Sequence, residues 1–416
     1  MWIPRLGALL SATVFGVGTL LGCGRQSANA PPCAWNVELS TRTLNDVNVA
    51  APDTAAAYWT LRYTVQPGLT LTVKGRFPDA RYLSFNTYDA RFRGFTTNGV
   101  ASAIADYKIE PDPGDVNPWR QPSAKGGSYT VSIRSTVNTG EVNALPLAPS
   151  DTPDGATGYL ILRTYLPAGG PAAVQLPTVT FATATSSRTV APCTAHNVGE
   201  LPRAVTDRRP RPGTPLPNQQ PSSGFHRVNA SGISAFPNVD AAYLVYVLVP
   251  PAADQVLVVR GKAPSHPVGD HSAPWPRSGL DVRYVSLCSY PSIFPAPVTH
   301  NQLPNGSYHD GCRDDSQTQV DPRGFYTYVV GTESQRAQIE TIPSVFVPIS
   351  SAHAQEKHFL LLRNLLANND FGHAVQNVPP DASPDQAAAV MGDYYPRATL
   401  CGLSSLAAHG ISACVA

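Results

Sequence analysis

Residues 79–88 (DARYLSFNTY) and 281–290 (DVRYVSLCSY) repeat one pattern of strand-forming residues. Three further pairs of segments match in the same order: 73–78 (VKGRFP) with 259–264 (VRGKAP), 127–133 (GSYTVSI) with 324–330 (GFYTYVV), and 159–163 (YLILR) with 359–363 (FLLLR). Matching segments that keep their order indicate an internal duplication. The chain is therefore expected to fold as two related units.

Hydrophobic patterning within each unit is that of β-strands. Residues 69–73 (LTLTV) and 129–133 alternate with period two, whereas 256–259 (VLVV) and 359–362 are continuous apolar runs of strand length. Prolines number 41 of 416, about twice the usual share, which disfavours long helices. We predict a mainly β fold of two tandem, related β-sandwich or jelly-roll-like domains with a few short helices.

Three segments carry helix signals. The best is 383–392, where Ser383 suits the N-cap, Pro384 the first turn and Gly392 the end. Residues 332–340 and 100–106 are weaker helix candidates.

Composition narrows the class of protein. With 42% hydrophobic residues the chain can bury two ordinary cores, and with 14% charged residues and a net charge of +1 it is unlike a nucleic-acid binder. The apolar content is too low for a membrane transporter, so a soluble fold is expected.

The N-terminus has the pattern of a bacterial lipoprotein signal. Arg5 precedes an apolar run over residues 6–21, and Leu20-Leu21-Gly22-Cys23 ends it. The run is 16 residues, shorter than the about 20 that a membrane-spanning helix needs. We predict that Cys23 is lipidated and anchors an extracytoplasmic bacterial protein to the cell membrane. An ordinary secretory signal, cleaved after Ala28 or Ala30, is the alternative.

Six cysteines remain after Cys23, and an even number in an exported chain suggests three disulfides. Domain logic and proximity in sequence favour Cys33 with Cys193, Cys288 with Cys312, and Cys401 with Cys414. No C-x-x-C occurs in the sequence, which makes a zinc ribbon or a thioredoxin-like site unlikely to be present.

These observations divide the chain into five parts. The parts are a signal peptide (1–22), a tether (23–32), a first β-domain (33–196), a Pro/Arg-rich linker (197–223), and a second β-domain (224–416) with an insertion at 265–280. The linker composition predicts an extended, semi-rigid tether. Its four arginines leave contact with anionic lipid headgroups as an alternative.

Residues 81–89 (RYLSFNTYD), 127–133 and 159–165 (YLILRTY) resemble the strands of a bacterial family catalogued as domain of unknown function twelve-fourteen. The resemblance covers about residues 75–170, and the whole chain also resembles actinobacterial exported lipoproteins of unknown role. The second copy matches less well, with Pro291 at the position of Asp89. The resemblance implies a β-domain and no particular reaction.

No local motif of catalysis or cofactor binding occurs: G-x-S-x-G, H-E-x-x-H, a phosphate loop and G-x-G-x-x-G are all absent from the mature sequence. No cofactor or metal is expected. Three alternatives stay open: a metal or ligand loop at His266, Asp270 and His271, Ca²⁺ at the carboxylates of 110–117 and 310–315, and a hydrolase whose acid and base meet only in space.

The ligand-binding candidates are Arg81, Tyr88, Asp89, Arg163 and Tyr165. Arg163 and Arg363 each end an apolar strand, where a guanidinium can reach an anionic group in a cleft or form an ion pair with a carboxylate such as Asp89. The tyrosines suit either a ligand site or strand packing. We expect a lipid-anchored, non-enzymatic binding protein of the cell envelope. Its alternatives are a structural or protein-interaction lipoprotein and the hydrolase.

Overall fold

The computed structural model describes residues 30–122, 126–194, 211–217, 219–228 and 236–414. The predicted signal peptide, Cys23, most of the tether and residues 197–210 of the linker lie outside these residues. None of the described helices is both long and apolar enough to cross a membrane.

Repeat 1 (residues 30–194) consists of two five-stranded sheets. In spatial order the first sheet contains β1 (Val37–Leu39), β2 (Ala56–Thr64), β10 (Thr157–Pro167), β4 (Ala80–Tyr88) and β7 (Ala103–Ala105). The second contains β12 (Ser187–Val190), β11 (Thr178–Ala182), β3 (Thr70–Arg76), β8 (Ser128–Arg134) and β9 (Ala144–Pro146). The small hairpin β5 (Thr96–Thr97) and β6 (Val100–Ala101) and the 3-10 turns η1 (Asp106–Lys108) and η2 (Pro171–Ala173) complete it.

Repeat 2 (residues 211–414) has the same plan. Its first sheet contains β13 (His226–Arg227), β14 (Ala241–Leu248), β22 (His358–Ala367), β16 (Val282–Pro291) and β19 (Cys312–Asp314). The second contains β21 (Val345–Pro348), β20 (Phe325–Gly331), β15 (Gln255–Lys262) and β23 (Arg397–Gly402), and β17 (His300–Gln302) and β18 (Tyr308–Asp310) form a hairpin. The helical elements are η3 (Glu333–Gln335), α3 (Arg336–Ile339), η4 (Val375–Asn377), α4 (Pro384–Met391), η5 (Gly392–Tyr394), α5 (Leu403–His409) and η6 (Ile411–Ala413).

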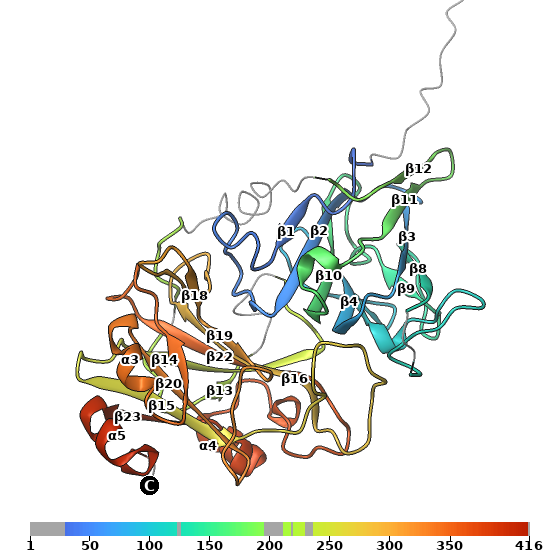
Figure 1. The fold of residues 1–416 in the computed structure, drawn as a ribbon. Helices are drawn as coiled ribbons and strands as arrows, with labels where there is room; N and C mark the ends of the chain where they lie inside the picture. The colour runs from blue at the N-terminus through green and yellow to red at the C-terminus, as the bar shows by residue number, and fades with distance from the viewer. Residues whose placement is uncertain (1–29, 123–125, 195–210, 218, 229–235, 415–416) are drawn as a thin grey trace, which may run out of the picture.

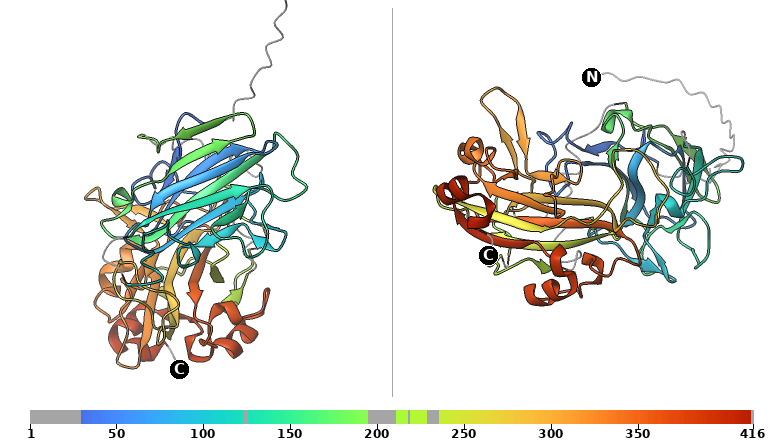
Figure 2. Two further views of the ribbon diagram at one scale, coloured as in Figure 1. Left: turned by 90° about the vertical axis from the view of Figure 1, so that its right-hand side faces the viewer. Right: turned by 60° about the horizontal axis from the view of Figure 1, so that its bottom comes forward.

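The strand orders of the two repeats correspond one to one, apart from β12, which has no counterpart. The correspondence includes an unusual detail: β8 pairs with β9 in parallel, and β20 pairs with β21 in parallel, although the other ladders are antiparallel. The molecule is thus mainly β, as predicted, with two related sandwiches. Figures 1 and 2 show repeat 2, in yellow to red, packed against repeat 1, in blue to green.

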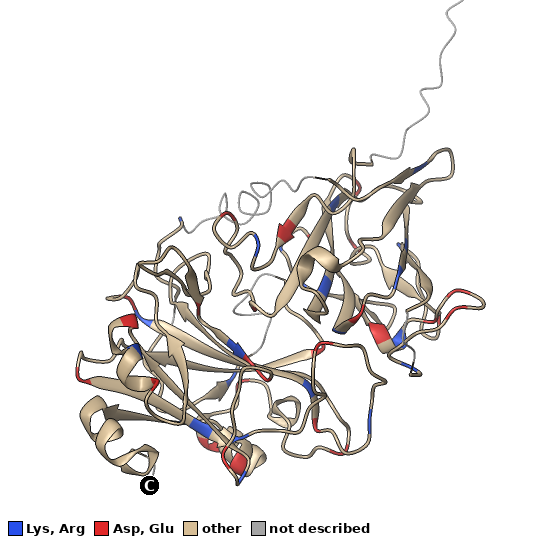
Figure 3. Cartoon of the chain, in the orientation of Figure 1, with Lys and Arg blue, Asp and Glu red and all other residues tan. Residues whose placement is uncertain are grey.

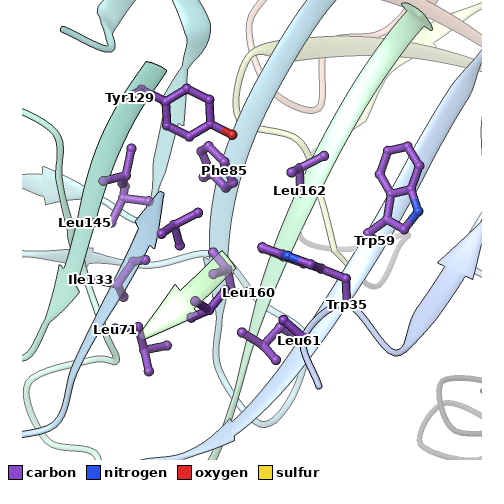
Figure 4. Close-up of a cluster of buried hydrophobic side chains, with 14 of the residues drawn as sticks. Trp35, Trp59, Leu61, Leu71, Phe85, Tyr129, Ile133, Leu145, Leu160 and Leu162 are labelled. Carbon is purple, nitrogen blue, oxygen red and sulfur yellow. The ribbon is translucent and has the colours of Figure 1, made fainter. Parts of the chain in front are cut away.

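The two sheets of each repeat enclose an apolar core. In repeat 1, Leu160 and Leu162 of β10 face Leu71 of β3 and Ile133 of β8, and all four are buried (Figure 4). A separate cluster in repeat 2 contains the equivalent side chains of β22, β15 and β20. The two separate cores agree with the two units expected from the repeated sequence segments.

Two of the three expected helical segments form. α4 begins after Ser383, whose hydroxyl accepts from the Gln386 backbone, and ends at Gly392. Residues 333–339 form η3 and α3. The helix expected at 100–106 was wrong, because Ala103–Ala105 instead pairs with β4 as the edge strand β7. Strand pairing in the folded sheet outweighs a weak local helix signal there.

The disulfides are Cys33–Cys193, Cys288–Cys312 and Cys401–Cys414, the pairs favoured by the sequence. The first joins the two ends of repeat 1 across 160 residues.

The described end of the linker is not an unpacked tether. Leu216 N–H donates to Ser292 O at 2.9 Å and Phe294 N–H donates to Thr214 O at 2.7 Å. These bonds hold residues 213–216 against repeat 2, which apolar periodicity alone could not indicate.

Candidate functional site

The first sheets of the two repeats are buried on both faces. Along β10, Leu160 and Leu162 point into the core of repeat 1, while the alternate residues Tyr159, Ile161 and Arg163 point to the opposite face. That face is not open to solvent, since Arg163 is 2% exposed. A strand that is buried on both faces has a nearly continuous run of apolar residues, as residues 159–163 have up to Arg163.

Each repeat sends a short segment across to the other. We name residues 50–55 crossing segment 1 and residues 236–240 crossing segment 2. Tyr290 OH, on β16 of repeat 2, donates to Pro52 O at 2.8 Å, and Tyr88 OH, on β4 of repeat 1, donates to Pro237 O at 2.9 Å. The two crossing segments are therefore exchanged between the repeats by a local two-fold relation.

The residue before each of these prolines has the same unusual backbone. Ala51 and Phe236 have φ of 50° and 61°, in the left-handed region that side chains other than glycine rarely adopt. In both places the conformation turns a carbonyl toward the arginine of the opposite repeat. Arg363 Nη2 donates to Ala51 O at 2.7 Å, and Arg163 Nη2 donates to Phe236 O at 3.0 Å.

Arg363 has a full set of partners. Its Nη2 also donates to Tyr290 OH at 2.7 Å, and its Nη1 lies 3.1 Å from Cys288 Sγ. Asp53 Oδ2 lies 3.5 Å from Nη1, and both side chains are almost completely buried. A buried guanidinium needs such a counter-ion because taking an unpaired charge out of water is costly.

Arg163 repeats this geometry without the counter-ion. Its Nη2 donates to Tyr88 OH at 3.0 Å, and its guanidinium carbon lies 5.4 Å from the centre of the Tyr58 ring. Among the described residues no carboxylate lies within ion-pair distance of it, and its Nε and Nη1 have no hydrogen-bond partner. Buried donors are nearly always paired, so two unpaired nitrogens on one guanidinium are unusual; among the described arginines, the partly buried Arg227 shares this feature.

One difference between the repeats accounts for the contrast. Asp53 follows Pro52 in crossing segment 1, and Asn238 follows Pro237 in crossing segment 2. Both lie beside the equivalent tyrosine of the other repeat. Tyr284 OH donates to Asp53 Oδ1 at 3.0 Å, whereas Tyr82 OH lies 3.4 Å from Asn238 Oδ1 and donates to Asp240 Oδ2 at 2.7 Å. A carboxylate in one copy is thus a neutral amide in the other.

A second exchanged pair closes the interface beside the crossing segments. Arg283 Nε donates to Arg81 O at 2.7 Å, and Arg81 Nη1 donates to Arg283 O at 3.2 Å. Arg283 pairs with Asp106 at 2.7 Å and Arg81 with Asp315 at 3.2 Å. Burial raises the pKa of Asp106 to about 6, against the opposing effect of Arg283, and burial likewise raises the pKa of Asp315. These four side chains form ion pairs between the repeats, so their charges are already compensated.

The insertion at 265–280 lies along repeat 1. Gly269 O accepts from Arg81 Nε at 2.8 Å, His271 Nδ1 lies 2.6 Å from Asp79, and Trp275 N–H donates to Trp119 O at 2.9 Å. The insertion is therefore a strap between the repeats. Its His266 and His271 face different partners, which does not fit a shared metal site.

The other metal candidates are also engaged. Asp315 corresponds to Asp106, which lies outside 110–117: each accepts from the backbone N–H of the matching strand residue, Val285 or Leu83. Among the described residues, one cluster of metal-ligating types was found: Asp53, Cys288 and Cys312. The two sulfurs are joined in a disulfide and offer no thiolate.

A pocket lies where the two crossing segments meet the two arginines. Its cavity volume is about 70 Å³, and the wider space of about 740 Å³ around it includes open solvent. Arg163 and Arg363 line it together with the residues Tyr58, Tyr165, Tyr243, Asn238 and Thr60, and the rest of the wall is apolar. Few, convergent polar groups in an apolar wall are typical of a small-molecule site. Figure 3 shows that most of the chain is uncharged, with Lys and Arg in blue and Asp and Glu in red scattered over both repeats.

The polar side chains of the pocket wall are two guanidiniums, the hydroxyls of three tyrosines and of Thr60, and the amide of Asn238. Burial raises the pKa of Tyr58 and raises that of Tyr165 well above its ordinary value, so both phenols stay neutral at pH 7. Among the described residues that line the pocket there is no carboxylate, imidazole or thiol. The wall can bind and orient a ligand, but it contains no pair of acid and base.

The five predicted ligand residues fall in three places. Arg163 and Tyr165 line the pocket, and Tyr88 OH accepts a hydrogen bond from Arg163. Arg81 belongs to the interface pair with Asp315. Asp89 pairs with Arg93 at 2.8 Å in a surface turn, so the suggested ion pair between Arg163 and Asp89 was wrong. Asp89 follows the last residue of β4, and its carboxylate also accepts from Arg91 N–H at 2.7 Å.

Sequence reasoning missed the pocket residues of the crossing segments. Asp53 and Asn238 precede their first strands by the same short distance, in PDTAAAY and PNVDAAY, and this match could have been noticed. It was not, because a Pro-Asp or Pro-Asn pair ordinarily marks a turn.

No protein-family model and no curated protein matches the chain. Among solved structures, an uncharacterised protein from Burkholderia cenocepacia is similar over 91% of this chain and 84% of its own, with a TM-score of 0.51 and 15% identity. A structural-genomics target from Vibrio parahaemolyticus matches 87% of this chain and 93% of its own at a TM-score of 0.42 and 11% identity. The first match shows that the fold over both repeats occurs elsewhere. The resemblance to the twelve-fourteen family stays a prediction.

Proposed function

We propose that this protein is a lipid-anchored, extracytoplasmic binding protein and that its ligand occupies the pocket between the repeats. The observation that carries the proposal is the guanidinium of Arg163, which lines an apolar-walled pocket and whose Nε and Nη1 have no hydrogen-bond partner. A buried donor without an acceptor costs about 1–3 kcal/mol, and more when it is charged. A bound molecule that supplies the acceptor recovers that free energy.

The location of the protein rests on the sequence. The Leu20-Leu21-Gly22-Cys23 motif supports acylation at Cys23, and three disulfides are typical of an oxidising compartment. In the bacterial host, the Cys23→Ser variant should lose acyl label and leave the membrane fraction. Retention of the variant in the membrane without label would contradict the anchor and leave the pocket untouched.

Ligand binding is tested on protein purified from its own host. Native mass spectrometry should find a small molecule that co-purifies with the full chain and that is released on unfolding. A pocket-filling variant, Ala51→Leu, should purify without it, whereas Lys74→Ala on the exposed side of β3 should keep it. A host-purified protein that carries no ligand and takes up none of the probes described below would refute the proposal.

A further inference from the structure

We propose that the pocket binds a monoanion, a carboxylate on an apolar body, and that the carboxylate is the counter-ion of Arg163. This inference rests on the proposed function and names its ligand class. It is drawn from the point at which the duplicated site departs from its own symmetry.

One positive charge at the pocket, that of Arg163, has no negative charge of the described protein beside it. Arginine stays protonated in proteins, so both guanidinium groups are charged. Asp53 compensates Arg363 at 3.5 Å. Among the described residues no carboxylate lies within ion-pair distance of Arg163, because Asn238 is neutral and Asp240 of the same segment accepts from Tyr82 OH at 2.7 Å instead. Burial keeps the phenols of Tyr58 and Tyr165 neutral. A ligand with one negative charge completes in repeat 1 the ion pair that the protein itself supplies in repeat 2.

The hydrogen bonds point to the same ligand group. Nη2 of Arg163 donates to Tyr88 OH and Phe236 O, so its Nε and Nη1 are the donors without partners. An ionised carboxylate accepts hydrogen bonds and donates none, so it suits a site in which this arginine offers only donors. An ammonium or other cation would add to the unpaired charge.

The rest of the wall selects an apolar body. Leu39 and Val49 approach from repeat 1, and Val228 and Leu361 from repeat 2. A phosphate monoester brings a charge of about −1.5 to −2 at pH 7, whereas the described residues that line the pocket include one guanidinium without a carboxylate partner. A monocarboxylate with an aliphatic or aromatic tail suits both parts of the pocket.

The test uses three probes with one tail: octanoate, octyl phosphate and 1-octanol, titrated calorimetrically into the mature chain freed of endogenous ligand. Octanoate should bind more tightly than the other two. A hydrogen bond to a charged group contributes about 1.5–3 kcal/mol, so Arg163→Gln should weaken octanoate about tenfold to a hundredfold and leave 1-octanol unchanged.

The variant Asn238→Asp is the sharper test, because it places a carboxylate where repeat 1 has Asp53 and keeps the size of the side chain. It should exclude octanoate while the protein stays folded, and Asp321→Asn, outside the pocket, should bind octanoate normally. If 1-octanol or octyl phosphate binds as tightly as octanoate, or if Asn238→Asp binds octanoate normally, the carboxylate inference is overturned and the binding function stands. If none of the probes binds and the host protein is empty, both fall.

Discussion

Replacing Asp53 with asparagine tests the charge balance of the interface most directly. The side chain is 1% exposed and accepts from Ser286 Oγ at 2.6 Å, from Ala55 N–H at 3.1 Å and from Tyr284 OH at 3.0 Å. Asparagine keeps one acceptor oxygen and the same shape, so the change removes chiefly the charge opposite Arg363. Breaking a buried ion pair by removing one partner costs about 3–5 kcal/mol.

That free energy sets a measurable shift. A change of 1 kcal/mol moves the melting temperature of a domain of this size by about 2–4 °C, so Asp53→Asn should melt about 6–20 °C lower in calorimetry. The control is Glu340→Gln, which breaks the half-exposed pair with Arg336 and should cost about 1 kcal/mol or less. If Asp53→Asn lost no more stability than the control, Asp53 would not be the counter-ion of Arg363, and the charge count of the pocket would fail with it.

Three further predictions concern the scaffold. Burial lowers the pKa of His358 from 6.5 to about 4, and its Nε2 accepts from Ser350 N–H at 2.9 Å. Between these pH values the unfolded chain binds more protons than the folded protein. His358 therefore contributes about 3 kcal/mol to the free energy of unfolding above about pH 6.5, and this contribution is lost toward pH 4. His358→Gln, compared with wild type and with the surface control His409→Gln by urea unfolding across this range, should remove that part of the pH dependence, and a difference that does not change with pH would refute it. Gly75→Ala should cost about 1–3 kcal/mol, because a Cβ there would lie 2.7 Å from both Tyr129 Oη and Pro177 Cβ, whereas Lys74→Ala on the same strand should cost little; equal costs would contradict the close approach. Removing Cys33–Cys193, which spans 160 residues, should cost about 5 kcal/mol against about 3 for Cys401–Cys414, which spans 13, and the reverse order in denaturant would argue against a loop-entropy origin.

Much of the scaffold could be predicted because its signals are local and occur twice. The alternation in β3 and β8 and the capping residues around α4 each specify one element, and the duplicated segments specify that the elements recur. The glycines at 75 and 261 belong to this class as well, since each lies opposite a tyrosine, Tyr129 or Tyr326, in the matching register. A motif that occurs in both repeats therefore indicates a requirement of the shared fold.

The site was harder to predict because its residues come together only when the repeats do. Arg163 carried a local signal as a polar residue closing an apolar strand, and this was read correctly as unusual. Its true neighbours, Phe236 and Asn238, lie in crossing segment 2, far along the chain. The nearest carboxylate in the aligned motif, Asp89, was the natural partner by sequence but turns away to Arg93. Residue type could show that an acceptor was needed, but not which segment would provide it.

The same exchange explains a feature of the sequence that a single sandwich cannot. In a lone antiparallel sandwich the outer faces of β10 and β22 would meet water and would alternate with polar residues. Here both faces are buried, one by the core of its own repeat and the other by the crossing segment of its neighbour. Under that cover, any polar residue on the outer face must find a partner from the other repeat. Arg81, Arg283 and Arg363 do so within the described chain, and Arg163 alone of the four does not obtain a carboxylate there. Crossing segment 1 supplies Asp53 beside Arg363, whereas crossing segment 2 has the neutral Asn238 at the matching position. This one difference between the repeats accounts for the absence of a carboxylate partner for Arg163 among the described residues.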